Sequence, residues 1–337
     1  MGRSQLLPMK IVTLFAAVAG LVIIALLFAW QDAGAVMGSL GTLGWGVVLL
    51  PLAWLPYPVV AAESWRVLFL DRQGPGLVRA VRAFWVGHAV GALLPTAGVG
   101  EPVVKVRMLV HDRLSGVAAS ASVVVDKTVE ALSLIVWGLV GVAVLVATQT
   151  GDDVVVAALV GSALIAAGTV GFIAVQRAGA FGFVTQRIFG LSRTGDGLGL
   201  ADKADEVDAT IRRLYDRAGR IAWSTALRTA ARSLMTIEIL VAAYLMGQPL
   251  TLWEAVMLRS LASALNGAAF VVPGGLGVQE GAFVALGAVA GLSPESMLAL
   301  SLATRGRELL VGVPGVLAWK HAEGKALLKR VSPGRDG

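Results

Sequence analysis

Five long stretches without Asp, Glu, Lys or Arg constrain the fold of this chain more than any other feature of its sequence. They cover residues 11–31, 33–62, 131–151, 154–176 and 260–279. Each is long enough for a membrane span, since about 20 apolar residues in a helix cross ~30 Å of hydrocarbon. Charged residues form only 15% of the chain, whereas soluble domains contain roughly 25%. We therefore expect an all-α polytopic membrane protein.

The positions of Lys and Arg between the apolar stretches predict how the chain is threaded. With the N-terminus in the cytoplasm, about six transmembrane helices and two inverted re-entrant helical hairpins place every basic loop on the cytoplasmic side. The spans are expected at 11–31, 43–62, 115–148, 154–175, 221–246 and 295–319, and the hairpins at 83–110 and 252–290. Both termini are then cytoplasmic. The net charge of +6 is explained by these loops, so we expect no nucleic-acid partner.

The expected cytoplasmic loop at 177–220 has its own pattern. Apolar residues recur at steps of three and four from Leu200 to Ile221. This spacing predicts an amphipathic helix that packs on the bundle or lies on the bilayer. A docking site for a partner protein is the alternative.

The topology can be tested directly because the chain contains no Cys. A cysteine placed at Ser192 should be protected from a membrane-impermeant thiol reagent in sealed cells, whereas a cysteine at Thr150 should react. The physical reason is that the loop around Ser192 is rich in Lys and Arg and the turn around Thr150 has none. Labelling at position 192 would contradict both the topology and the inverted hairpins.

The chain also matches itself at an offset of 178 residues. Pro95 aligns with Pro273 at this offset and Glu101 with Glu280 at an offset of 179, so each copy has a Pro/Gly break followed by a glutamate that opens the next helix. Three spans separate the two breaks, which predicts inverted repeats at approximately 64–150 and 240–320 within one membrane domain, residues 1–337. The same offset aligns a basic residue and the Glu three positions later in both copies: Lys127 and Glu130, Arg305 and Glu308.

The break in the second copy is rich in glycine, which lets the backbone turn inside a membrane where the freed amides face protein or water. It contains Pro273, Gly274, Gly275 and Gly277. Glu280 follows it, as Glu101 follows the first break. These glutamates either cap the half-helices or couple movement to a cation by taking up protons, and the sequence leaves both roles open.

Several charges fall within the expected spans, where one charge costs about 2.5–3.5 kcal/mol on insertion scales. Arg228 and Arg232 stand one turn apart with no acid within a turn, so their guanidinium groups are suited to a phosphate. Structural ion pairs that lock the bundle are the alternative. The full set of candidate substrate-binding residues is Asp126, Lys127, Glu130, Arg228, Arg232, Arg305 and Glu308.

Enzyme motifs are missing from the sequence. It has no G-x-x-x-x-G-K-[ST] phosphate loop, no H-E-x-x-H zinc motif and no G-x-S-x-G nucleophile motif. We expect no catalytic residues, no metal and no cofactor, and a transporter rather than an enzyme. A membrane enzyme stays open if Asp126, Glu130 and Arg305 cluster.

These motifs resemble a known family, the flippase-like integral membrane domain of lysylphosphatidylglycerol synthases and of many stand-alone bacterial and archaeal proteins. The resemblance rests on Leu94–Glu101, Ser120–Lys127, Val272–Gly281 and Arg305–Glu308, and Pro-Gly-Gly-x-Gly-x-x-Glu is its most specific motif. The stretches 121–130 and 307–319 resemble a subgroup encoded beside hopanoid-biosynthesis genes. The resemblance implies a lipid-handling protein of the bacterial inner membrane.

We therefore expect a translocase that moves an amphipathic lipid between leaflets through a charged cavity near the membrane midplane. The lipid would be a phospholipid, a polyprenyl-phosphate-linked lipid or a hopanoid, and lipid-biosynthesis enzymes are candidate partners. Two alternatives remain open: a lipid-modifying membrane enzyme, and a non-catalytic partner in a lipid or hopanoid biosynthesis complex.

Overall fold

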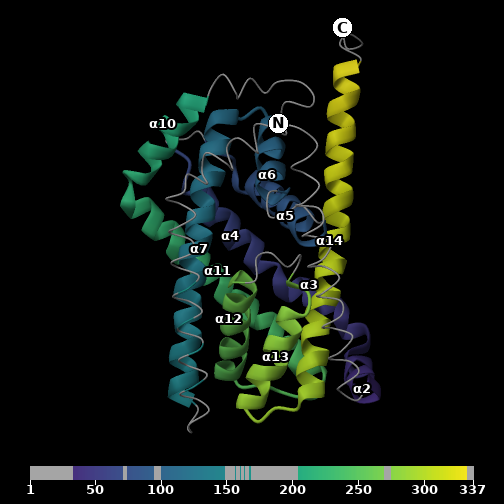
Figure 1. Cartoon of the computed structure of the whole chain (residues 1–337). Coiled ribbons are helices and arrows are strands. Elements are labelled where there is room, and N and C mark those ends of the chain that lie inside the picture. The colour runs from purple at the N-terminus through teal and green to yellow at the C-terminus, as the bar shows by residue number, and fades with distance from the viewer. Residues whose placement is uncertain are drawn as a thin grey trace, which may run out of the picture. The chain divides into compact units, whose positions relative to one another are not determined.

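The computed structural model describes residues 33–70, 74–94, 100–148, 204–268 and 275–331, together with residues 156, 160, 163 and 167 (Figure 1). Every regular element in this part of the chain is a helix, as expected for an all-α membrane protein. The expected span at 11–31 and the labelling positions Ser192 and Thr150 lie outside the described residues, as does nearly all of the span at 154–175.

Two compact units share the described residues. The first consists of the described parts of Met1–Tyr57, Glu130–Ala178 and Arg228–Arg307. The second consists of those of Pro58–Val129, Gly179–Leu227 and Glu308–Gly337. Three long helices contribute one part to each unit: α7 (Gly116–Thr148), α11 (Ala218–Leu245) and α14 (Pro294–Val331).

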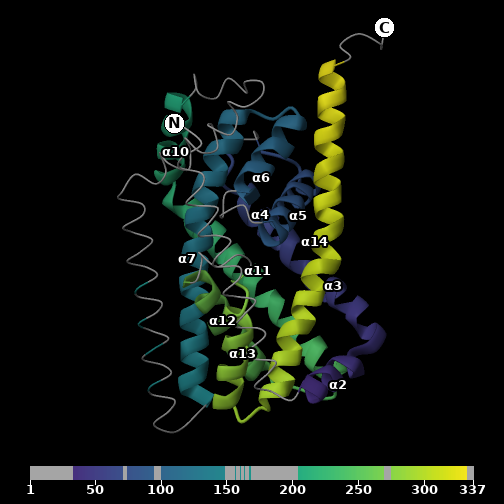
Figure 2. The same cartoon turned by 45° about the vertical axis from the view of Figure 1, so that its right-hand side comes forward.

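The second unit contains a hairpin of two helices that pack side by side, α5 (Leu77–Leu93) and α6 (Gly100–His111) (Figures 1 and 2). Most of α4 (Pro56–Arg66), all of α10 (Ala204–Tyr215) and parts of the three long helices complete it. Its apolar core includes Trp65, Leu68, Val86, Leu109 and Val125.

The first unit contains the corresponding hairpin, α12 (Leu252–Ala268) and α13 (Val278–Val289), again side by side. Three short helices precede it: α2 (Ala33–Leu43), the 3-10 helix η1 (Gly44–Val48) and α3 (Leu49–Trp54). Its core includes Leu50, Ile239, Leu258, Phe283 and Leu298.

The boundaries of the hairpin helices follow the offset of 178 residues. The second helix of the hairpin begins at Gly100 in α6 and at Val278 in α13. The next helix begins at Gly116 in α7 and at Pro294 in α14. The inversion of the two repeats and the re-entry of the hairpins into a membrane stay predictions.

Two stretches of the described chain are long and apolar enough to cross a membrane, Val36–Arg66 and Gly116–Thr148. The second coincides with the span expected at 115–148. The first includes the span expected at 43–62, but it is built from several short helices and not from one regular α-helix. Gly44 has a positive φ of 45° and is the first residue of η1, while Pro56 starts a new helix. Proline lacks an N–H and a 3-10 turn winds more tightly, so both interrupt a regular α-helix.

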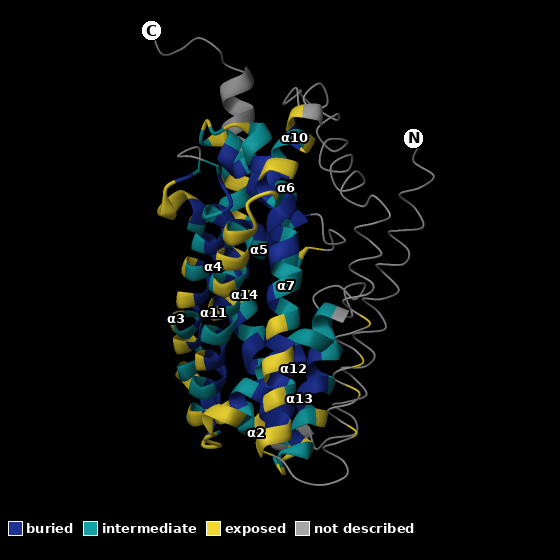
Figure 3. Ribbon diagram, turned by 90° about the vertical axis from the view of Figure 1, so that its left-hand side faces the viewer, coloured by how far each residue is buried: buried dark blue, intermediate teal, exposed yellow. Residues whose placement is uncertain are grey.

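Large apolar side chains are exposed along the long helices. Leu139 and Val146 on α7 are 51% and 58% exposed, and Leu317 on α14 is 59% exposed. Figure 3 shows α7 changing along its length from buried and intermediate to exposed residues. Extended apolar surface is rare on soluble monomers and is what a lipid environment accepts.

The amphipathic segment folds differently from the expected continuous seam. α10 ends at Tyr215, and α11 begins at Ala218 after a turn. Arg220 Nη1 donates a hydrogen bond of 2.7 Å to the carbonyl of Phe69, which anchors the start of α11. The apolar face of α10 is buried in the core of the second unit by three residues: Val207, Ile211 and Leu214. Packing on the bundle therefore explains this seam.

Candidate functional site

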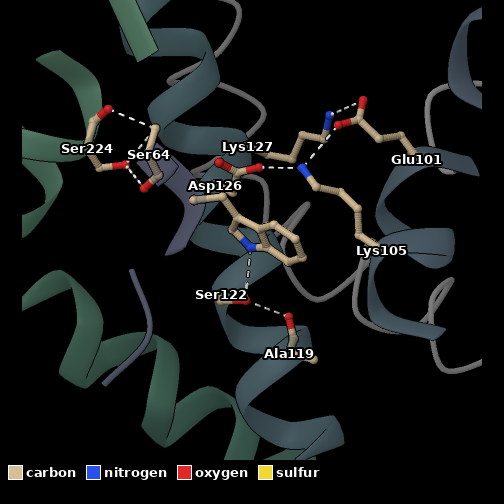
Figure 4. A network of polar contacts seen from close by, with 9 residues as sticks. Ser64, Glu101, Lys105, Ala119, Ser122, Asp126, Lys127 and Ser224 are labelled. Carbon is tan, nitrogen blue, oxygen red and sulfur yellow. Dashed lines mark hydrogen bonds and ion pairs between the residues drawn. The ribbon is translucent and has the colours of Figure 1, made fainter. Parts of the chain in front are cut away.

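Four charged side chains of the second unit form one hydrogen-bonded group, which we call the lysine cluster: Glu101, Lys105, Asp126 and Lys127 (Figure 4). Lys127 Nζ lies 3.3 Å from Glu101 Oε2. Lys105 Nζ lies 3.1 Å from Glu101 Oε1 and 2.8 Å from Asp126 Oδ2. The cluster therefore joins α6 to α7 and has no net charge when all four groups are ionised.

Accessibility falls from one end of the lysine cluster to the other. The side chain of Lys127 is 32% exposed and that of Glu101 is 17% exposed, whereas Lys105 and Asp126 are both 0% exposed. The Lys105 ammonium also lies 4.8 Å from the ring centroid of Trp65 and 4.6 Å from that of Phe84, within cation–π range. The cluster is open at Lys127 and sealed at Asp126.

Two glycines of α5 make room for the lysine cluster. A Cβ at Gly87 would lie 2.9 Å from Lys105 Cγ and 3.2 Å from the Glu101 carbonyl oxygen. A Cβ at Gly91 would lie 3.2 Å from Glu101 Cβ. His88 lies between these glycines in the sequence, and its ring stacks on that of Phe84 at 6.4 Å. The close approach of α5 to α6 therefore depends on the absence of side chains at both glycines.

The first unit holds a smaller group, the arginine pair, formed by Glu280 and Arg305. Arg305 Nε donates to Glu280 Oε1 at 2.9 Å, and Arg305 Nη2 donates to the carbonyl of Gly275 at 2.9 Å. Glu280 Oε2 accepts a hydrogen bond of 2.8 Å from the N–H of Gly277. Glu280 thus caps the start of α13 and holds a cation at the same time. Pro273 and Gly274, which were also expected to shape this break, lie outside the described residues.

The backbone of this break uses glycine as the sequence predicts. Gly275 and Gly277 have positive φ values of 60° and 77°, which side chains disfavour. These conformations point the N–H of Gly277 at Glu280 and the carbonyl of Gly275 at Arg305. A residue with a Cβ would adopt them only with strain.

The lysine cluster and the arginine pair share one arrangement. Lys127 and Arg305 stand at equivalent positions of the repeat, and each is held by the glutamate that opens the second helix of its own hairpin. Glu130 and Glu308, three residues after these cations in the sequence, lie on the same helix face as the cations. The sequence leaves capping and coupling open for the hairpin glutamates; in the structure both glutamates pair with a cation and Glu280 also caps α13, while coupling stays a prediction.

The two repeats differ at the sealed end. At the offset of 178 residues, Lys105 and Asp126 correspond to Phe283 and Thr304, which are 0% and 1% exposed. Gln279 Nε2 donates to Thr304 Oγ1 at 2.9 Å. A buried ion pair in one repeat is thus replaced by an aromatic and a hydrogen-bonded hydroxyl in the other.

A further buried pair belongs to the first unit. Arg307 donates two hydrogen bonds, of 2.8 and 3.1 Å, to the two carboxylate oxygens of Glu238 on α11. The side chains are 2% and 0% exposed, and the guanidinium lies 5.5 Å from the ring centroid of Trp54. This geometry is that of a structural pair, because neither group is accessible to a substrate.

The guanidinium of Arg232 has acceptors that its own helix does not supply. Arg232 Nε donates to Ser133 Oγ at 3.0 Å and Nη2 donates to the carbonyl of Glu130 at 3.4 Å. Arg228 is only 2% exposed. The expectation considered acids on the same helix, whereas the acceptors of Arg232 are neutral groups of α7.

Two features of the site were missed in the sequence. Lys105, the centre of the lysine cluster, follows Glu101 by four residues, a spacing that places them on one helix face and gives a usable signal. Glu238 and Arg307 are 69 residues apart and no local pattern connects them.

A family model described as the lysylphosphatidylglycerol synthase TM region matches residues 17–315. The match includes both hairpins and all of the charged groups described above. No curated protein and no solved structure matches the chain.

Proposed function

This chain belongs to the lysylphosphatidylglycerol synthase TM-region family, and from that premise we propose that it translocates a lipid between the two leaflets of a membrane. The family indicates a membrane protein related to lipid handling. In this proposal the protein moves the lipid without modifying it, and protein charges bind the headgroup while the tails stay in the bilayer. The lipid is anionic or hopanoid-related, and the membrane is the bacterial inner membrane with both termini in the cytoplasm.

One observation carries the proposal: each unit holds a paired cation that is also accessible, at equivalent positions of the repeat. The side chain of Lys127 is 32% exposed and that of Arg305 is 15% exposed. An accessible cation exchanges its carboxylate for the phosphate of a headgroup without opening the core. The sealed cations Lys105 and Arg307 do not have this freedom.

Exchange of partners also lowers the cost of moving charge through hydrocarbon. A single charge at the bilayer centre costs about 2.5–3.5 kcal/mol on insertion scales. In the resting protein Glu101 and Glu280 neutralise the two cations, and in the loaded protein the phosphate does so. Arg305 offers a planar fork for two phosphate oxygens, and Lys127 offers a point charge. Arg232 is a further phosphate ligand in this proposal.

The double variant Lys127→Gln/Arg305→Gln should fold and insert but move lipid at least about tenfold more slowly. A hydrogen bond to a charged group contributes about 1.5–3 kcal/mol, and about 1.4 kcal/mol corresponds to a factor of ten. The measurement is the quenching by dithionite of fluorescently labelled phosphatidylglycerol in proteoliposomes. Arg66→Gln is the matched control, because Arg66 forms an ion pair of 2.6 Å with Glu63 and its side chain is 40% exposed.

A wild-type rate in the double variant would remove both cations from the path. A change in the mass of extracted lipid would favour a lipid-modifying enzyme instead. The leaflet composition of cells with and without the protein distinguishes a phospholipid from a hopanoid as the lipid moved.

A further inference from the structure

We propose that the lysine cluster is a proton-binding site whose protonation releases Lys127 to an anionic headgroup, so that one proton moves with each lipid. This inference rests on the proposed function and adds its driving force. Three observations support it: the difference between the two repeats, the hydrogen-bonded path from Lys127 to Asp126, and the ability of lysine to relay a proton.

The second repeat shows that these two positions of the hairpin fold do not need to hold an ion pair. Phe283 and Thr304 occupy the positions of Lys105 and Asp126, and the corresponding helices begin at equivalent residues. Burying two charges costs several kcal/mol per ion before their attraction repays it, so apolar replacements are often neutral or stabilising. The fold does not require an ion pair at these positions, yet the first repeat keeps Lys105 and Asp126 paired at 0% exposure. We therefore attribute this pair to function.

A continuous path of hydrogen bonds leads to this pair from the accessible end. It runs from Lys127 to Glu101 over 3.3 Å, to Lys105 over 3.1 Å and to Asp126 over 2.8 Å. Carboxylates and ammonium groups alternate along it. A lysine relays a proton by giving one to a carboxylate and accepting another, whereas an arginine stays protonated. The arginine pair therefore offers no such path.

The surroundings of the lysine cluster are largely apolar and aromatic. From α4, Trp65 covers the Lys105 ammonium and donates to Ser122 Oγ at 3.1 Å. From α5, the ring of Phe84 also lies within cation–π range of the ammonium, and His88 is the titratable side chain of that helix near Glu101. α6 and α7 contribute the four members of the cluster. A proton bound here is thus exchanged through Glu101 and Lys127 or through His88.

The proton balance is simple. A hydronium ion on the loading side gives up a proton and becomes water, and the proton forms an O–H bond with the carboxylate of Asp126, which becomes neutral. The net charge of the cluster rises from zero to +1. Lys105 then takes Glu101 as its counter-ion, and Lys127 is released to pair with one phosphate charge. On the other side the proton returns to water and Lys127 returns to Glu101, which expels the phosphate.

The test uses proteoliposomes that contain labelled phosphatidylglycerol and an internal pH dye. For the wild-type protein, a pH gradient should drive proton uptake and shift the ratio of labelled lipid between leaflets by up to about tenfold per pH unit, the value for one proton. Asp126→Asn should move lipid without any response to the gradient. Asp112→Asn is the matched control, since Asp112 pairs at 2.7 Å with Arg82, whose side chain is 50% exposed.

A second variant guards against misfolding: Lys105→Phe/Asp126→Thr installs the residues of the second repeat and should also be insensitive to the gradient. A wild-type protein that moves lipid with no gradient response overturns the inference and leaves translocation intact. A gradient response in Asp126→Asn overturns it as well. If the wild-type protein moves no lipid, the proposed function fails, and infrared spectroscopy still decides the proton site. A protonated-carboxyl band that appears on acidification in the wild-type protein and not in Asp126→Asn supports the site, and its absence overturns it.

Discussion

Glu280→Gln should give a folded, membrane-inserted protein that moves lipid at least about tenfold more slowly than the wild type. Glutamine keeps an oxygen to accept the 2.8 Å hydrogen bond from the N–H of Gly277, so the cap of α13 survives. It does not neutralise Arg305, whose Nε lies 2.9 Å from the carboxylate. The lost charge-assisted bond contributes about 1.5–3 kcal/mol, enough for the expected factor. Proteoliposome assays of lipid movement, with membrane yield as the folding control, measure it.

Glu254→Gln is the matched control, because Glu254 caps the neighbouring helix of the same hairpin. Its carboxylate accepts hydrogen bonds of 2.7 and 2.8 Å from the N–H and hydroxyl of Thr251. This variant should lose about 0.3–1 kcal/mol of stability and keep wild-type lipid movement.

Glu101→Gln should be milder than Glu280→Gln in lipid movement, since Asp126 still pairs with Lys105, but it should lose the response to a pH gradient. Wild-type lipid movement by Glu280→Gln would leave Glu280 with a capping role alone.

Removing one member of the Glu238–Arg307 pair should have the largest effect on stability. Glu238→Leu or Arg307→Met leaves an uncompensated buried charge and should cost about 3–5 kcal/mol of unfolding free energy. The double variant should recover most of this loss, because similarly sized apolar side chains then fill the site beside Trp54. Unfolding in detergent, followed for the wild type and three variants, gives the coupling energy.

The Arg82–Asp112 pair is the control for this cycle. Its Arg82 side chain is 50% exposed, so the loss of either member should cost less than about 1 kcal/mol. If the two single losses at Glu238 and Arg307 simply add in the double variant, the groups are not coupled and the structural interpretation of the pair is wrong.

The helical elements were largely predictable because their signals are local. The apolar run that ends near Thr148 and the two hairpin breaks each depend on residues that are neighbours in the sequence. α7 begins within one residue of the expected span. α12 likewise begins at the expected residue, Leu252. The apolar composition of 43–62 did not predict that this stretch divides into short helices. Those breaks depend on the positive φ of Gly44 and on the missing N–H of Pro56, which composition does not describe.

The charged groups were only partly predictable. The sequence identified the repeated glutamates and cations, since their spacing recurs in both halves. It did not identify Glu101 as the partner of Lys127 or the acceptors of Arg232, because those contacts join different helices. The exposure of each ion is also set by what packs around it, as Trp65 and Phe84 do around Lys105.

The sequence by itself determined that this protein is helical and apolar, that it carries two similar hairpins, and that each hairpin opens its second helix with a glutamate. These properties depend on residues within a few positions of one another, where helix periodicity and Pro/Gly conformations act. Only the tertiary structure decided which cation each glutamate holds, which ion pairs are sealed and which stay accessible. Those outcomes depend on helices that are distant in the chain and adjacent in space, such as the α6 and α7 segments that bring Lys105 within 2.8 Å of Asp126.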